Sequence, residues 1–223
     1  MFAPSKSIFF VTKDADGKAD GVTSDLSKAY AASLGIPVEE VLYPNSGAAA
    51  DALEAGDVDV TFMPVDASRQ ARFEVGPAYT FVESTFMVTG ETGITKVEEV
   101  DREGIRIAAV ADTSTLRLAQ ASLKKASIVP VATVAEAVQL MKDGKADGFA
   151  LSRDSLPAYV AQIPGSRIVE GAFQRSGVAI MVQKGNKDAL EAATDFITTA
   201  RTDGTIRKAL DHAGYTDQAV ADQ

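Results

Sequence analysis

Two stretches of the sequence carry the same helix-to-strand turn, 88 positions apart. The first, EAGDVDVTF, contains Gly56 and Asp59, and the second, KDGKADGFAL, contains Gly144 and Asp147. In each copy a helix-like segment runs into Gly, two further residues, Asp and then an apolar strand. Glycine suits the left-handed position that follows a helix, and we interpret the Asp as a structural residue of the turn. The repetition therefore predicts two similar α/β units.

Strand-like and helix-like segments alternate in both halves, which predicts mostly parallel sheets flanked by helices. In the first half we expect strands at 8–12, 38–43 and 58–63 and helices at 24–34 and 48–55. In the second half we expect strands at 105–111, 127–131 and 146–151 and helices at 115–125 and 134–143. Extended apolar runs at 80–90 and 176–185 connect the halves, and helices at 188–202 and 205–213 follow.

A chain that crosses out of one unit and returns to it has two connecting segments. We therefore predict one lobe from residues 1–87 and 181–223 and a second lobe from residues 88–180. A cleft between two lobes is a preferred place for a small ligand, and paired connectors allow hinge closure.

Composition removes several classes of function. The formal net charge is −9, which argues against nucleic acid or an anionic membrane surface as a partner. Cysteine is absent and His212 is the only histidine, so thiolate chemistry and multi-histidine metal sites are excluded. We expect no metal and no cofactor. No apolar run approaches the length of about 18–20 residues that crosses a bilayer.

Several motifs occur in a characteristic order along almost the whole chain. They are DGKADGVTSDLSKAYAASLGIPVEEV, ALEAGDVDVTFMPVDASRQARFEVGPAY, GIRIAAVADTST and LMKDGKADGFALSRDSLPAYV. In order and spacing they resemble the bacterial extracellular solute-binding proteins of family 3, which deliver polar amino acids to ABC importers. The resemblance implies a two-lobed periplasmic binding protein-like fold of type II.

The same resemblance implies a function. We expect a monomeric, periplasmic solute-binding protein, not an enzyme, that closes over a small carboxylate-bearing ligand and presents it to the membrane subunits of an ABC importer. The N-terminus shows no export signal, so the location rests on the resemblance. The alternatives are an enzyme similar to cyclohexadienyl or arogenate dehydratases, which share the fold, and a detached ligand-sensor domain.

In the first lobe, the candidate ligand residues follow the strand 58–63. Arg69 matches the arginine that clamps a ligand carboxylate in the family, and its planar guanidinium suits that task. The alternative is a solvated arginine. Asp66 either binds a cation or braces Arg69, three residues later. Phe62 and Pro64 stand where the family often has small or hydroxyl-bearing residues, and neither donates a hydrogen bond through its side chain.

In the second lobe, Thr113, Ser114 and Thr115 come after the strand 105–111 and begin a helix. Hydroxyls and free backbone N–H groups at a helix start favour an anion. The alternative is helix capping without a ligand, and both roles are compatible.

The class of ligand depends on the loop after the strand 146–151. In the family an Asp here commonly pairs with the ligand's α-ammonium. Without gaps that place falls on Ser152, followed by Arg153, which would favour an anion without an amino group. If the loop shifts by two residues, Asp154 restores an amino-acid site. Alternatively, Asp154 caps a helix at 155–161.

Overall fold

The computed structural model describes residues 2–4, 12–13 and 19–222, with side chains described from residue 19 onward. The chain divides into two compact units. Lobe 1 comprises residues up to Phe81 and from Ser176, and lobe 2 comprises Val82–Arg175. Both crossings lie a few residues earlier in the chain than the boundaries at 87 and 180 that the sequence suggested. Each lobe is described by itself below.

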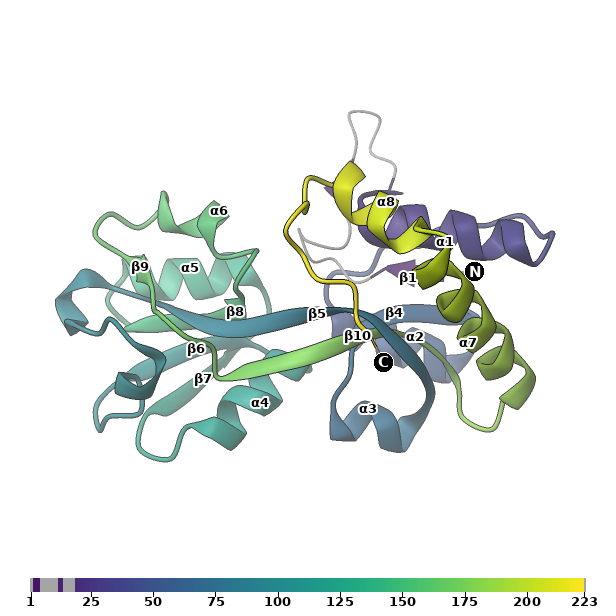
Figure 1. Ribbon diagram of the computed structural model, residues 1–223. Coiled ribbons are helices and arrows are strands. Elements are labelled where there is room, and N and C mark those ends of the chain that lie inside the picture. The colour runs from purple at the N-terminus through teal and green to yellow at the C-terminus, as the bar shows by residue number, and fades with distance from the viewer. Residues whose placement is uncertain (1, 5–11, 14–18, 223) are drawn as a thin grey trace. The chain divides into compact units, whose positions relative to one another are not determined.

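Lobe 1 is an α/β unit in which β1 pairs in parallel with β4 and β10 pairs antiparallel to β4 (Figure 1). Its strands are β1 (Phe2–Pro4), β2 (Thr12–Lys13), β3 (Ala19–Asp20), β4 (Val60–Pro64), the first part of β5 (Phe73–Val88) and most of β10 (Gln174–Gln183). Its helices are α1 (Val22–Ser33), α2 (Ser46–Ala55), α3 (Ala67–Arg72), α7 (Lys187–Thr202) and α8 (Thr205–His212).

Lobe 2 contains a sheet in which β6 pairs in parallel with β7 and β8, and β8 pairs antiparallel to β5. Its strands are the end of β5, β6 (Arg106–Val110), β7 (Ser127–Val131), β8 (Gly148–Ser152) and β9 (Arg167–Ile168). Its helices are α4 (Ser114–Ser122), α5 (Val134–Lys142), α6 (Pro157–Val160) and the 3-10 turns η1 (Gly90–Thr92) and η2 (Val97–Glu99).

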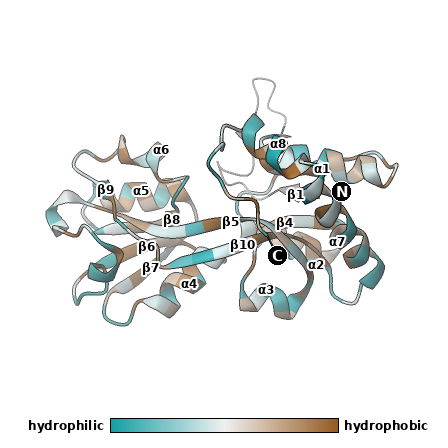
Figure 2. Ribbon diagram, in the orientation of Figure 1, coloured by the Kyte–Doolittle hydropathy of each residue, from teal (hydrophilic) through white to brown (hydrophobic). Residues whose placement is uncertain are grey.

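Alternation along the strands of lobe 2 creates two cores, because successive side chains point to opposite faces of a sheet. Ile107 packs in one cluster with Leu116 of α4, and its neighbour Ala108 packs in the other with Val138 of α5. Figure 1 shows α4 and α5 on opposite faces of this sheet. In Figure 2 the hydrophilic residues gather on outer turns of helices such as α7 and α8.

The repeated turn has the same hydrogen bonds in both copies. In lobe 1 the N–H of Asp57 donates to the carbonyl of Ala52 at 2.9 Å, and in lobe 2 Lys145 donates to Leu140 at 2.8 Å. Gly56 and Gly144 both have positive φ, 82° and 65°. This is the pattern that ends a helix on a left-handed residue.

The repeated Asp in lobe 2 is structural, as expected. Asp147 accepts from Nε and Nη2 of Arg106 at 2.9 and 2.8 Å and from the Arg106 backbone N–H at 2.8 Å. These bonds tie the turn before β8 to the start of β6. The Arg106 guanidinium lowers the pKa of the Asp147 carboxyl.

Most expected elements are present, with two differences. The strand expected at 38–43 is wrong, since this segment has only an isolated bridge residue at Glu40. The Glu40 carboxylate instead accepts from the Ser27 hydroxyl of α1 at 2.8 Å. The helix expected at 155–161 shrinks to the four residues of α6. The strand expected at 8–12 lies almost wholly outside the described residues.

Candidate functional site

In lobe 1 the loop after β4 is shaped by a helix cap. Asp66 is the N-cap of α3, and its carboxylate accepts from the backbone N–H of Arg69 at 3.0 Å. Its second oxygen lies 4.0 Å from Nε of Arg69. Of the two roles considered for Asp66, the structure shows the brace.

The guanidinium of Arg69 lies inside lobe 1, with only 1% of the side chain exposed. Nη1 donates to the carbonyl of Pro64 at 2.7 Å, and Nη2 donates to Oγ and the carbonyl of Ser46 at 2.7 and 3.1 Å. Arg69 therefore joins the end of β4 to the first turn of α2. It is not the solvated arginine that one interpretation expected.

Arg72 provides the contrast within the same helix. Its guanidinium is partly exposed and pairs with Asp51 and Glu54 of α2 at 2.8 and 2.5 Å. It also lies over the Phe73 ring, 5.1 Å from the centroid. Arg72 is thus a surface residue in ordinary ion pairs.

Phe62 occupies the core of lobe 1. Its side chain is fully buried, and its ring contacts Tyr79 in an edge-on arrangement with centroids 6.1 Å apart. Pro64 is half-buried and contributes its carbonyl to Arg69. The geometry accounts for both residues as scaffold, and their contact with a ligand stays a prediction.

In lobe 2 a strained turn leads from β6 to α4. Asp112 has φ +61°, and it is the only residue other than glycine with positive φ among those described. Thr113 caps α4, since its hydroxyl accepts from the Leu116 N–H at 3.2 Å and donates to the Val110 carbonyl at 2.7 Å. Ser114 is buried and Thr115 half-buried in the first turn. The cap orients the first backbone N–H groups of the helix outward along its axis.

The residues after β8 separate into two roles. The hydroxyl of Ser152 donates to the hydroxyl of Ser155 at 2.8 Å. Nε of Arg153 pairs with the Glu83 carboxylate of β5 at 3.1 Å, and Nη2 donates to the carbonyl of Gly171. The Arg153 guanidinium is thus paired within lobe 2. This weakens the argument that the ligand is an anion without an amino group.

Asp154 carries a carboxyl group without a matching donor. Its Oδ2 atom is buried, and no residue in the described part of the chain donates a hydrogen bond to it. Burial raises the pKa of the Asp154 carboxyl to about 7, against a smaller opposing influence of its own backbone N–H. The predicted capping role is wrong, because the N-cap of α6 is Leu156.

The predicted residues lie in three local groups. In lobe 1, Asp66 and Arg69 meet Pro64. In lobe 2, Thr113–Thr115 begin α4, and Ser152–Asp154 lie at the end of β8 and in the turn after it. Sequence reasoning did not pair Arg69 with Ser46 or Arg153 with Glu83. Ser46 follows Asn45, whose side chain caps α2, and the Asn-Ser-Gly start of that helix is a readable capping signal. Glu83 offers no such signal.

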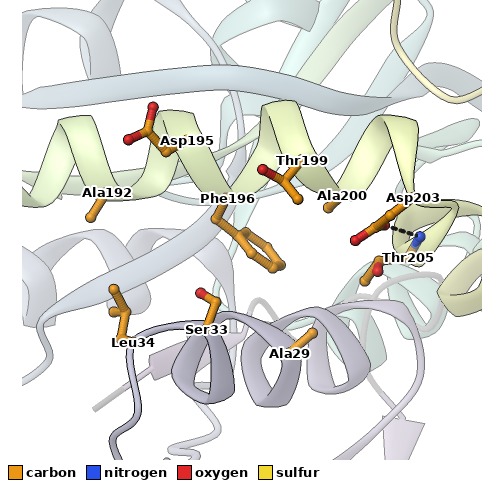
Figure 3. A pocket seen from close by; sticks show the side chains of 10 residues that line it. All are labelled: Ala29, Ser33, Leu34, Ala192, Asp195, Phe196, Thr199, Ala200, Asp203 and Thr205. Atoms are coloured by element: carbon orange, nitrogen blue, oxygen red, sulfur yellow. Dashed lines mark hydrogen bonds between the residues drawn. The ribbon is translucent and has the colours of Figure 1, made fainter.

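A surface groove of about 430 Å³ lies elsewhere on lobe 1, between α1 and the α7–α8 pair (Figure 3). Phe196 and alanines line it, together with the carboxylates of Asp195 and Asp203. Asp203 accepts from the Thr205 N–H at 2.8 Å. None of the predicted ligand residues lines this groove. Its lining includes no Lys or Arg, so it lacks a counter-ion for a carboxylate.

The described residues contain no group of three or more His, Cys, Asp or Glu side chains that could hold a metal ion. None of their helices combines the length and the apolar character needed to cross a membrane.

Solved structures similar to this chain are amino-acid-binding proteins. An ancestral arginine-binding protein bound to glutamine is 25% identical, with 96% of this chain and 97% of that chain covered and a TM-score of 0.81. An ancestral amino acid-binding protein, a precursor of cyclohexadienyl dehydratase, is 24% identical, with 94% and 92% covered and a TM-score of 0.78. A putative ABC transporter binding component from Wolinella succinogenes, complexed with lysine, is 22% identical, with 94% and 92% covered and a TM-score of 0.80.

The comparison with curated proteins gives no match. The family model for bacterial extracellular solute-binding proteins, family 3, matches residues 5–213. That match covers nearly the whole chain, and the similar structures share the type II periplasmic binding protein fold. This chain therefore belongs to the bacterial extracellular solute-binding proteins, family 3.

Proposed function

We propose that this solute-binding protein takes up an amino acid in the periplasm and delivers it, as a monomer, to an ABC importer. The full-length similarity to an arginine-binding protein bound to glutamine supports this function. The lobes close over the ligand, which stabilises the closed form only through contacts that it makes there.

The single observation that carries the ligand class is the carboxyl group of Asp154. A buried polar atom without a hydrogen bond is costly unless something else provides the donor. An α-ammonium group provides three donors and a compensating charge. Asp154, and not Ser152, is therefore the ammonium partner in our proposal, and Arg153 holds the turn in place by its bonds to Glu83 and Gly171.

The ligand carboxylate is assigned to the start of α4. Arg69, whose side chain is 1% exposed and donates to Pro64 and Ser46, supports the loop after β4 in lobe 1. In lobe 2 the backbone N–H groups of Ser114 and Thr115 begin α4, where the helix dipole favours negative charge. Thr113 keeps that helix start ordered.

The proposal is tested by calorimetric titration of a panel of amino acids and of the same compounds without the amino group. We expect only the amino acids to bind. Replacing Asp154→Asn should weaken binding by about 30- to 1,000-fold, because it removes one partner of a buried charge pair. Glu103→Gln, which removes one exposed negative charge from lobe 2, is the control and should bind as wild type. Equal binding of the des-amino compounds would show that Asp154 is not the ammonium partner.

A second candidate function is catalysis by Asp154. A carboxyl group with a pKa of about 7 is protonated in a useful fraction of molecules at neutral pH, and such a group can protonate a leaving hydroxyl so that it departs as water. The chain shares its fold with an ancestral amino acid-binding protein that is a precursor of cyclohexadienyl dehydratase. Turnover of prephenate or arogenate by wild type, abolished in Asp154→Asn, would favour the enzyme over the binding protein.

A further inference from the structure

The last residues of β5 in lobe 1 are held by the C-terminal part of the chain. Arg201 of α7 donates to the carbonyl of Ala78 at 2.6 Å, and the N–H of Ala221 donates to the carbonyl of Tyr79 at 3.0 Å. The hydroxyl of Thr80 donates to the carbonyl of Ala219 at 2.8 Å. Three consecutive residues of one strand therefore each have a bond to α7 or to the segment that follows α8.

Gln218 completes this series at the boundary of the lobe. Its side-chain amide donates both to Oγ1 of Thr80 at 3.0 Å and to the carbonyl of Phe81 at 2.8 Å. Phe81 is the last residue of lobe 1 before the chain crosses into lobe 2. One side chain thus fixes the orientation of the final peptide group on the lobe 1 side.

The segment Tyr215–Ala221, which we call the C-terminal strap, is itself anchored to α8. Nη1 and Nη2 of Arg207 donate to the carbonyls of Gln218 and Tyr215, each at 2.6 Å. Arg207 also pairs with Asp211 one turn later at 2.9 Å. The strap therefore connects β5 to a helix and does not rest on the strand alone. In Figure 1 it is the yellow coil that leads from α8 to the C-terminus.

The partners of β5 change immediately after Val82. The carbonyl of Glu83 accepts from the Arg153 N–H at 2.8 Å, and the carbonyl of Ser84 accepts from the Phe173 N–H at 3.0 Å. From here onward these bonds come from lobe 2. A backbone fixed on both sides concentrates any rotation in the few residues between the fixed points.

We propose that Gln218 is a positioning residue that fixes the lobe 1 side of the first crossover, so that closure bends the chain around Val82. The inference rests on the proposed function, since it assumes that the lobes close over a ligand. Without this anchor the ligand-free protein would sample a wider range of interlobe geometries. Ligand binding must then restrict more freedom, which lowers affinity without removing any ligand contact.

The test measures the interlobe distance distribution of the full chain by pulsed electron resonance. The sequence contains no cysteine, so Thr198→Cys on α7 and Gln120→Cys on α4, both exposed, take two unique spin labels. Gln218→Met keeps the length of the side chain and removes both donors. Thr216→Ala changes an exposed residue of the strap and is the matched control. Arg207→Met removes the hydrogen bonds that anchor the strap to α8.

We expect a broader ligand-free distribution in Gln218→Met and Arg207→Met, and a wild-type width in Thr216→Ala. The amino acid that wild type binds should bind Gln218→Met about 3- to 10-fold more weakly. A lower melting temperature with an unchanged distribution in both variants would overturn the proposal, because Gln218 would then only stabilise lobe 1. If wild type binds no amino acid, the proposed function fails, and the ligand-free widths still decide the role of Gln218.

Discussion

The predicted sites of the two lobes treat buried charged groups in opposite ways. In lobe 1, Arg69 is 1% exposed and donates to Pro64 and Ser46 while Asp66 lies beside it. In lobe 2, Asp154 has a buried oxygen, and no described residue donates a hydrogen bond to it. The charge of Arg69 is thus compensated by other groups of lobe 1, whereas the carboxyl group of Asp154 has no such compensation among the described residues of lobe 2.

The difference separates two uses of a buried charge. A charge with partners stabilises the fold that supplies them, and losing one partner is expensive. A charge without partners costs free energy in the ligand-free protein and is characteristic of functional sites. The comparison predicts that mutations of the two residues will change stability in opposite directions.

The largest effect should come from Arg69→Ala. The substitution leaves Asp66 buried without its counter-charge and leaves the carbonyl of Pro64 without a donor, so we expect a loss of about 3–5 kcal/mol in the free energy of unfolding. Arg72→Ala is the control, because its ion pairs are exposed and contribute about 0–1 kcal/mol. Urea unfolding measures both. A small change in Arg69→Ala would mean that lobe 1 does not depend on this charge.

Asp154→Asn should stabilise the ligand-free protein at pH 8. The folded pKa of about 7 lies above the ordinary value of 3.8, so the folded state binds its proton more tightly than the unfolded state. Stability is therefore highest below pH 3.8 and falls as the pH rises through about 7. The gain at pH 8 is on the order of 4 kcal/mol at most, and it should vanish near pH 4. A destabilised Asp154→Asn at pH 8 would contradict the contrast with Arg69.

The repeated turns offer a smaller test, in which the two lobes should behave alike. Gly56→Ala and Gly144→Ala each place a side chain at positive φ, which costs about 1–2 kcal/mol. Gly56→Ala should cost slightly more, because its Cβ would lie 3.2 Å from Nε2 of Gln183 while that of Gly144 would meet open space. Asn tolerates this conformation better and is the matched control. If the melting temperature falls in only one of the two Ala variants, the turns are not equivalent.

The smallest effect concerns His212 of α8, which lies 2.7 Å from the carboxylate of Asp25 on α1. Asp25, and more weakly Asp20, raise the pKa of His212, while Lys28 opposes them. The stabilisation is present below pH 6.5 and is lost as the pH rises through the raised folded pKa. We expect His212→Gln to reduce slightly the difference in melting temperature between pH 6 and pH 8. An unchanged difference would show that the ion pair between His212 and Asp25 does not contribute to stability.

The sequence predicted lobe 2 better than lobe 1. Its strand at 127–131 has the expected bounds, and the other strands and α4 and α5 start or end within a few residues of expectation. These segments have strong periodicity and clear caps such as Thr113 and Thr133. In lobe 1 the segment 38–43 has the composition of a strand, yet Glu40 contacts α1, and Val41 and Tyr43 pack against the core cluster that contains Leu53 and Met63. Local preference does not decide such a competition.

The candidate site shows the same limit. The positions of Arg69 and Asp154 were readable, since each follows a predicted strand at a motif. Their states were not, because these depend on partners distant in sequence. Ser46 lies 23 residues from Arg69, and Glu83 lies 70 residues from Arg153. Nothing in the local sequence pattern indicates that Arg153 has hydrogen-bond partners within lobe 2. Nor does it indicate that Oδ2 of its neighbour Asp154 has no donor among the described residues.

If Asp154 is the ammonium partner that we propose, its carboxyl group also determines how many protons are released when the ligand binds. With a pKa of about 7, a sizeable fraction of ligand-free molecules carries a proton there at neutral pH, and an arriving ammonium group displaces it. The heat of binding should then depend on the ionisation enthalpy of the buffer, and the affinity should fall about tenfold for each pH unit well below 7. In our proposal, ligand binding therefore exchanges a proton for an ammonium group at the Asp154 carboxylate.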